Sequence, residues 1–294
     1  MAGFPERKKL SLSEFIQFAY FSLAFYAAQI RTIIKSIFMI KEKMAYFRFY
    51  EELNDFLPQG KKKVKFQHTF ILRESVKDMI EAIGVPHAEV DLILVNGISK
   101  GFNYLVQDSD EISVYPVFES FDITDVQHLR PRPLREPKFI ADVHLGSLAR
   151  YMRMAGLDTF YENTINNCDM VKLSLSENRA ILTRDRELLK RNDITHGYFV
   201  RRNTAEEQLK EVVNRFNLKA EVKPFSRCME CNTSFNAVDE EIISDRLPEK
   251  VKLYHDTFYI CRSCNKIYWK GSHYTNMLKM LEKSGVYNSN FPLI

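Results

Sequence analysis

Four of the five cysteines in this 294-residue chain stand in two Cys-x-x-Cys pairs. This spacing is typical of metal knuckles, and four thiolates can close a tetrahedral shell around Zn²⁺. Because a closed shell leaves no open coordination position, the expected zinc is structural and not catalytic. The predicted zinc ligands are Cys228, Cys231, Cys261 and Cys264.

Carboxylates follow two apolar runs that are predicted to be strands. Asp142 ends "KFIAD" and Asp185 comes just after "AILT", while Asp169 opens a predicted helix and Glu187 lies two residues beyond Asp185. In open parallel sheets such groups converge outside the carboxyl ends of the strands. Clustered carboxylates favour Mg²⁺ or Mn²⁺, which can activate water and stabilise charge on a phosphoryl oxygen. Taken singly, these aspartates can equally be helix caps or turn residues.

Basic residues lie next to these acids. Arg184 and Arg186 flank Asp185, and Arg150 and Arg153 are one turn apart on a predicted helix. Together they predict a path for a nucleic-acid backbone along the acidic crevice, because arginines contact phosphates. The alternative for Arg150 and Arg153 is a solvated helix face.

The second cysteine pair is followed by aromatic and basic residues. Lys266, Trp269 and Lys270 could contact phosphates and stack on bases, or the aromatics could simply pack against the ribbon. We expect a surface or RNA-contacting role for His273. Cys168 is interpreted as a buried or incidental thiol, since no His and Asn arrangement supports a cysteine nucleophile.

Strand and helix patterns alternate from residue 138 to about 218, which predicts a mostly parallel sheet with helices on its faces. Upstream, residues 45–118 have the order strand, strand, helix, strand, strand. The Pro- and Arg-rich stretch "LRPRPLREP" at 129–137 marks a boundary between these two regions.

The uncharged, aromatic stretch at 15–30 is short of the roughly 20 residues needed to cross a bilayer. A helical hairpin or a long helix packed on another domain or a partner is the favoured interpretation, ahead of a membrane-surface helix and of a true span. A secretory signal pattern is absent, and the paired cysteines suit a reducing cytoplasm. The net charge of +4 does not decide for or against nucleic-acid binding.

Residues 45–119 resemble the ubiquitin-like β-grasp module of sulfur carriers. Such carriers act through a free C-terminal Gly-Gly, but here the chain runs on into "ESFDITDVQHLRPRPLREP" without a diglycine. The resemblance therefore implies an accessory or docking role and not carrier chemistry.

The stretches "FIADVHLGSLARYMRMAGLD", "CDMVKLSLSENRAILTRDRELLKR", "RCMECN" and "YICRSCNKIYWKGSH" together resemble the Mut-seven C-terminal RNase family, whose fold is similar to that of PIN-domain nucleases. The resemblance implies that Asp142, Asp169 and Asp185 are acidic ligands of a catalytic Mg²⁺ or Mn²⁺, with Glu187 as an auxiliary acid. Two departures are Ser147, where the family usually has Arg, and Glu187, where it usually has Asp.

The sequence thus predicts a metal-dependent ribonuclease of mixed α/β and α+β class. The alternative is a non-catalytic RNA-binding or ribosome-associated adaptor. Expected partners are RNA and a protein that binds the β-grasp domain or the N-terminal helix, with a membrane less favoured. The predicted parts are a helical N-terminal extension (1–43), a ubiquitin-like β-grasp domain (44–120), a linker (121–137), a PIN-like RNase domain (138–223) and a zinc ribbon with a C-terminal tail (224–294).

Overall fold

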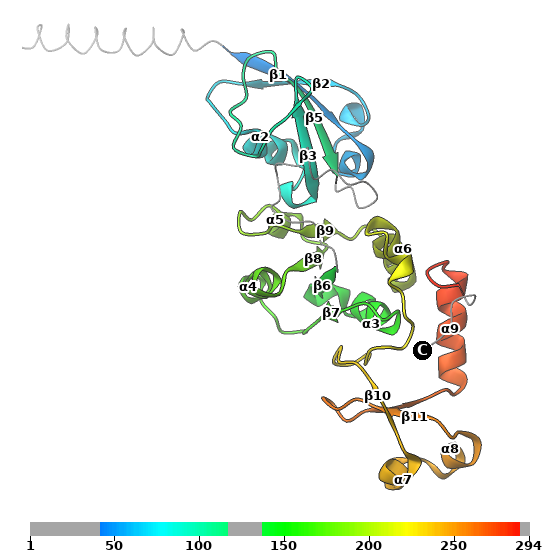
Figure 1. Cartoon of the computed structure of the whole chain (residues 1–294). Coiled ribbons are helices and arrows are strands. Elements are labelled where there is room, and N and C mark those ends of the chain that lie inside the picture. The colour runs from blue at the N-terminus through cyan, green and yellow to red at the C-terminus, as the bar shows by residue number, and fades with distance from the viewer. Residues whose placement is uncertain (1–41, 117–136, 289–294) are drawn as a thin grey trace, which may run out of the picture.

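The computed structural model describes residues 42–116 and 137–288. The predicted N-terminal extension up to residue 41, most of the predicted linker and the last six residues lie outside the described residues. Figure 1 shows three units in a row, with the parallel-sheet domain between the N-terminal sheet domain and the cysteine-rich ribbon. Within the described residues, no helix combines the length and the apolar character that a membrane span requires.

The first unit is a five-stranded sheet of order β2-β1-β5-β3-β4. Its first and last strands, β1 and β5, pair in parallel, and the other pairs are antiparallel. This is the β-grasp arrangement that the sequence predicts. The strands are β1 (Lys43–Phe49), β2 (Phe66–Phe70), β3 (Val90–Val95), β4 (Ile98–Ser99) and β5 (Glu111–Pro116), with the 3₁₀ helices η1 (Glu51–Phe56), η2 (Gln59–Lys61) and η3 (His87–Glu89) between them.

Helix α2 (Val76–Ile83) covers this sheet, and both of its ends are determined locally. The Ser75 hydroxyl accepts a hydrogen bond from the Asp78 amide at 3.1 Å, which caps the first turn. Gly84 ends the helix at φ +116°, a conformation that favours glycine. The apolar face of α2 is fully buried in one core with Phe47 and Ile93.

The second unit has a four-stranded sheet of order β7-β6-β8-β9, parallel throughout. Every residue of the central strand β8 is buried, as expected for a strand covered on both faces. The strands are β6 (Lys138–Ala141), β7 (Thr159–Phe160), β8 (Arg179–Thr183) and β9 (Gly197–Phe199). The alternation of strands and helices predicted from the sequence is confirmed.

Helices cover both faces of the parallel sheet, because successive strand residues point to opposite sides. Phe139 and Ala141 of β6 join one core with α3 (Gly146–Met154) and α6 (Ala205–Arg215). Ile140 joins a second core with α4 (Asn167–Glu177) and α5 (Arg186–Leu189). The domain is therefore a three-layer α/β unit, with the short 3₁₀ helices η4 (Val143–Leu145) and η5 (Leu218–Ala220) in its loops.

The third unit is a three-stranded antiparallel ribbon of order β10-β11-β12. The final helix returns from this ribbon to the α/β unit, where Leu281, Val286 and Tyr287 share the core of α3 and α6. The predicted boundary between 223 and 224 thus divides residues that pack together. The elements are β10 (Asn236–Val238), α7 (Glu240–Ile243), η6 (Ser244–Arg246), α8 (Glu249–Tyr254), β11 (Phe258–Ile260), β12 (Ile267–Trp269) and α9 (Ser272–Lys283).

Candidate functional site

Asp142 lies at the carboxyl end of β6 and is only 4% exposed. One carboxylate oxygen accepts the His144 amide at 2.8 Å, which caps η4. The other oxygen accepts the Thr183 hydroxyl and the Arg184 amide. The predicted role as a local cap is therefore real, and the same carboxylate is also tied to the end of the neighbouring strand β8.

Thr183 links Asp142 to Asp185. Its hydroxyl donates to Asp142 and accepts the Asp185 amide at 2.9 Å. One oxygen of Asp185 accepts the amides of Glu187 and Leu188 at the start of α5. The carboxyl ends of β6 and β8 thus bring two of the four predicted acids to one edge. The part played by Thr183 was missed, because a threonine in a buried strand has no distinguishing sequence signal.

Asp169 and Glu187 are exposed, and each pairs with the lysine three positions further along the chain. Asp169 accepts Lys172 at 3.1 Å and the Asn166 side chain at 2.7 Å, and these bonds hold its pKa below the usual value. Glu187 accepts Lys190 at 2.9 Å. In residues 42–116 and 137–288, no three of these four acids form a group that could hold a metal ion as they stand.

Arg184 and Arg186 border this acidic edge, as predicted, and both are exposed. Arg184 donates to the Arg202 carbonyl at 3.0 Å and to the Asn203 side chain at 3.2 Å. The guanidinium of Arg186 lies 5.0 Å from the centre of the Phe199 ring and makes a similar contact with Phe56 in the β-grasp domain. These contacts hold both arginines next to Asp185.

The RNA-contacting role predicted for Arg153 is wrong. Its side chain is buried, at 5% exposure, and donates to four backbone carbonyls, including those of Thr159 and Glu230. A helix periodicity puts Arg150 and Arg153 on one face but does not reveal that the first cysteine knuckle covers that face. Arg150 remains exposed, 4.0 Å from the carboxylate of Glu230.

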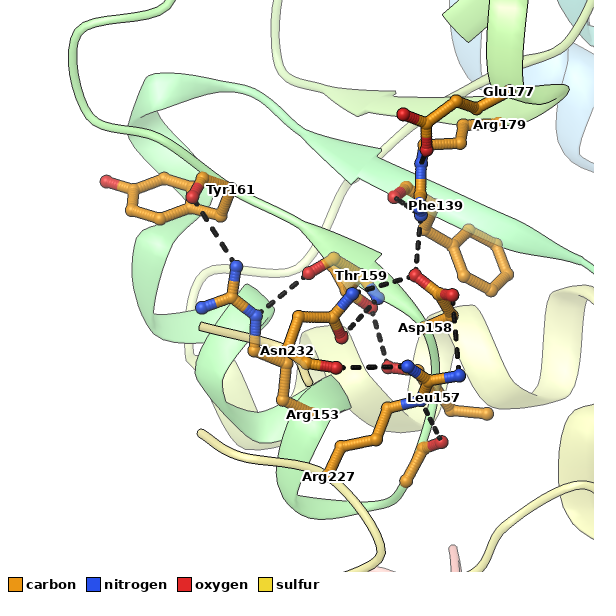
Figure 2. A network of polar contacts seen from close by, with 11 residues as sticks. Phe139, Arg153, Leu157, Asp158, Thr159, Tyr161, Glu177, Arg179, Arg227 and Asn232 are labelled. Carbon is orange, nitrogen blue, oxygen red and sulfur yellow. Dashed lines mark hydrogen bonds and ion pairs between the residues drawn. The ribbon is translucent and has the colours of Figure 1, made fainter. Parts of the chain in front are cut away.

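A polar network joins the α/β domain to the first knuckle (Figure 2). Asp158 accepts Arg179 at 2.6 Å, Asn232 at 2.8 Å and Arg227 at 3.3 Å. Asn232 also accepts the Thr159 amide at 3.0 Å. Burial acts to raise the pKa of Asp158, but the hydrogen bonds from Arg179 and Asn232 outweigh it and lower the pKa. This network fixes the ribbon at the amino end of the parallel sheet, opposite the acidic edge.

A second buried pair joins the β-grasp domain to strand β9. Glu89 is fully buried and accepts Arg201 at 2.9 Å and the Phe199 amide at 2.5 Å. Burial raises the pKa of Glu89, and Arg201 only partly offsets that effect. Arg201 also pairs with Asp55 at 3.0 Å, and Ala88 enters the core of α4 and α5. The β-grasp domain is therefore docked on the α/β domain.

The four predicted cysteine ligands meet at one point. Their sulfur atoms all lie within 4.8 Å of one another, with Cys231 and Cys261 3.2 Å apart and Cys228 and Cys264 3.5 Å apart. Four Zn–S bonds of about 2.3 Å in a tetrahedron place the sulfurs about 3.8 Å apart, so the donor set fits Zn²⁺. The described residues hold no comparable His, Cys, Asp and Glu group.

The two knuckles have the same backbone geometry, and its sequence signal is the Asn that follows each pair. Asn232 and Asn265 adopt left-handed φ values of 70° and 58°. Their amides donate to the carbonyls of Cys228 and Cys261 at 2.9 and 2.8 Å. Burial acts to raise the pKa of Cys231, but hydrogen bonds, led by those of Thr233, lower it to about 6, whereas burial raises the pKa of Cys261 and Cys264. A thiolate is the form that binds zinc.

The remaining predicted residues surround the second knuckle. Lys266 pairs with Glu230, and Trp269 is half-buried beside the ribbon core. Lys270 and His273 are exposed. Cys168 is exposed as well, which excludes the buried alternative and leaves the incidental thiol, and its sulfur lies 3.8 Å from Arg191.

Fold and site define a three-part protein in which a parallel-sheet domain with acids at its carboxyl edge joins a β-grasp domain to a four-cysteine ribbon. The Mut7-C RNAse domain model matches residues 137–281, and the Mut7-C ubiquitin model matches residues 42–122. The chain therefore belongs to the Mut7-C RNase family, with the ubiquitin-like domain in front. Neither curated proteins nor solved structures gave a match. The RNAse domain indicates a nuclease-like role.

Proposed function

We propose that the chain is a metal-dependent ribonuclease that hydrolyses RNA phosphodiester bonds at the edge formed by Asp142, Thr183 and Asp185. The observation that supports this most is that the Thr183 hydroxyl joins the Asp142 carboxylate to the backbone amide of Asp185, which brings two acids to the ends of adjacent parallel strands. The match to an RNAse domain over the same residues supports the reaction class.

The donor set at this edge suits a hard cation, because it consists of carboxylate oxygens. Asp142 and Asp185 would hold Mg²⁺ or Mn²⁺, which when bound supplies an activated water and neutralises charge on the phosphate. Asp142 is fixed in place by three hydrogen-bond donors and therefore needs little reorganisation. Arg184 and Arg186 would attract the RNA backbone to the edge.

Asp169 and Glu187 would act only after leaving their lysine partners. Both carboxylates are largely exposed, at 56% and 79% of the side chain, so exchange of the lysine for a cation costs little. In this proposal Asp169 is a further metal ligand and Glu187 an auxiliary acid. The partner of the β-grasp domain or N-terminal helix stays a prediction.

The test is cleavage of mixed labelled RNAs by the zinc-loaded chain with Mn²⁺ or Mg²⁺, with and without EDTA. We expect metal-dependent products, a large loss for Asp142→Asn and a smaller loss for Glu187→Gln. Circular dichroism and zinc content serve as controls for folding, because Asp142 is buried. Cleavage that persists unchanged in EDTA contradicts the proposal.

The second candidate is an RNA-binding or ribosome-associated adaptor without catalysis. The pairing of Asp169 with Lys172 and of Glu187 with Lys190 favours it, since both acids are already neutralised. This candidate predicts RNA binding without metal-dependent products in the same assay.

A further inference from the structure

The ribbon and helix α9 enclose a cavity of about 280 Å³ that the acidic edge does not use. Its volume is just below the range of about 300–1,000 Å³ that is usual for ligand pockets. Among its lining residues are six aromatic side chains from three separate segments of the chain. They are Phe225, Phe235, Tyr259, Tyr268, Trp269 and Tyr274.

Two aromatic pairs form part of the walls. The rings of Phe225 and Tyr274 have centres 4.4 Å apart and are tilted by 39°, and those of Phe235 and Tyr268 are 4.6 Å apart and tilted by 48°. The Tyr268 hydroxyl lies 3.1 Å from the sulfur of Cys228. The zinc site therefore helps to fix the position of one wall.

Phe225 has an unusual backbone conformation, with φ at +60°. A left-handed conformation is rare for a bulky residue and is found most often where structure serves function. The Phe225 amide donates to the Met154 carbonyl at 2.8 Å, which ties this strained residue to α3. The chain thus holds an aromatic ring at the pocket at some conformational cost.

A cation is available at the mouth of the pocket. Lys270 is exposed, and its ammonium group lies 6.0 Å from the centre of the Tyr274 ring. Among the described residues it forms no ion pair with an acid. Aromatic faces beside an unneutralised cation are the two features that bind single-stranded nucleic acid, by stacking on bases and by contact with phosphates.

We propose that this pocket holds one unpaired base of single-stranded RNA, with Lys270 beside the adjoining phosphate. The proposal relies on the proposed function for RNA as the ligand, but it does not depend on cleavage. Since the ribbon is fixed at the amino end of the sheet, the base held here belongs to a nucleotide several positions from the one at the acidic edge. A base in a duplex is paired and stacked, so double-stranded RNA is the weaker ligand.

Trp269 is the single tryptophan of the chain and lines the pocket, so its fluorescence reports directly on occupancy. The zinc-loaded full chain is titrated with a single-stranded RNA oligonucleotide in a buffer that contains a weak chelator and no Mg²⁺ or Mn²⁺. The zinc content is checked afterwards. An abasic oligonucleotide of equal length is the matched ligand. We expect the single-stranded oligonucleotide to quench the Trp269 fluorescence and the abasic oligonucleotide to quench it little. Equal quenching by both overturns the proposal.

Tyr274→Leu removes an aromatic face and Tyr274→Phe retains it. Stacking on an aromatic side chain gives an expected loss of affinity of roughly 5- to 150-fold for Tyr274→Leu and almost none for Tyr274→Phe. Lys270→Gln should weaken binding and reduce its salt dependence. If Tyr274→Leu does not fold, the test is the comparison of fluorescence quenching by the single-stranded and the abasic oligonucleotides on the unmodified chain.

The pocket and the cleavage proposal fail in different ways. Base-dependent quenching without cleavage in Mn²⁺ supports the pocket and contradicts the nuclease. If the unmodified chain cleaves RNA, and its Tyr274→Leu variant folds and binds RNA with unchanged affinity, the pocket alone is contradicted. Quenching by a peptide rich in aromatic residues, but not by RNA, also contradicts the base pocket.

Discussion

Replacing Asp158 by Asn should weaken the junction between the parallel-sheet domain and the ribbon. Asn preserves the shape of the side chain but removes the charge that faces Arg179 and Arg227, and it can no longer accept at both positions. Removal of one partner from a buried ion pair typically costs about 3–5 kcal/mol. Because Asp158 is 18% exposed and Arg179 also pairs with Glu177, we expect a loss of about 2–3 kcal/mol.

The pH dependence of this loss has a definite sign. The folded pKa of Asp158 is lowered, so its stabilising effect is present above the unfolded pKa of about 3.9 and is lost as the pH falls through the folded value. The difference in unfolding free energy between the unmodified chain and Asp158→Asn should therefore be constant near neutral pH. It should shrink below about pH 4.

The assay is urea unfolding of the zinc-loaded chain, followed by the fluorescence of Trp269, which lies in the ribbon. Asp193→Asn is the matched control, because Asp193 also pairs with an arginine but both side chains are partly exposed, at 44% and 37%. We expect the control to lose less than about 1 kcal/mol. Equal losses for the two variants at neutral pH refute the reasoning.

Three further changes test other parts of the fold. Gly156→Ala should lower the free energy of unfolding, measured by thermal unfolding, by at least about 2 kcal/mol, because the added Cβ would lie 2.2 Å from a backbone carbonyl oxygen and φ is +86°. Gly60→Ala is the control and should be nearly neutral, since its Cβ would have nothing within 4 Å. Cys261→Ser should release zinc, as measured by elemental analysis, and unfold the ribbon; full zinc retention would contradict this. Glu89→Gln should lower stability by about 2–4 kcal/mol, because it leaves Arg201 without its buried partner, and an unchanged melting temperature would count against the docked arrangement.

Local patterns were sufficient for much of this molecule. The cysteine pairs, with an Asn after each, determine the knuckles from short stretches of chain. Buried strands followed by Asp142 and Asp185 indicate a parallel sheet with acids at its carboxyl edge, because strand period and order are read from neighbouring residues. The family resemblance extended this interpretation to the whole arrangement of domains.

Contacts between distant segments were not predictable in this way. Glu89 and Arg201 are 112 positions apart, and nothing near either residue indicates the other. The same holds for Arg153, whose helix face is covered by a knuckle 77 positions away. The sequence predicts only a ribbon with a C-terminal tail for the region of helix α9, because only the tertiary structure shows that Leu281 meets the α3 and α6 core.

Single-turnover cleavage of a labelled RNA in Mn²⁺ by Asp185→Asn tests the central claim most directly. Asp185 is exposed, so the substitution should preserve the fold and the zinc content while removing a charge that would hold the cation. Asp193→Asn is again the control, with unchanged cleavage expected. We predict a loss of about 100-fold or more for Asp185→Asn, equivalent to about 2.7 kcal/mol of barrier. Cleavage at the rate of the unmodified chain would contradict the account, because Asp185 would then be only the cap of helix α5.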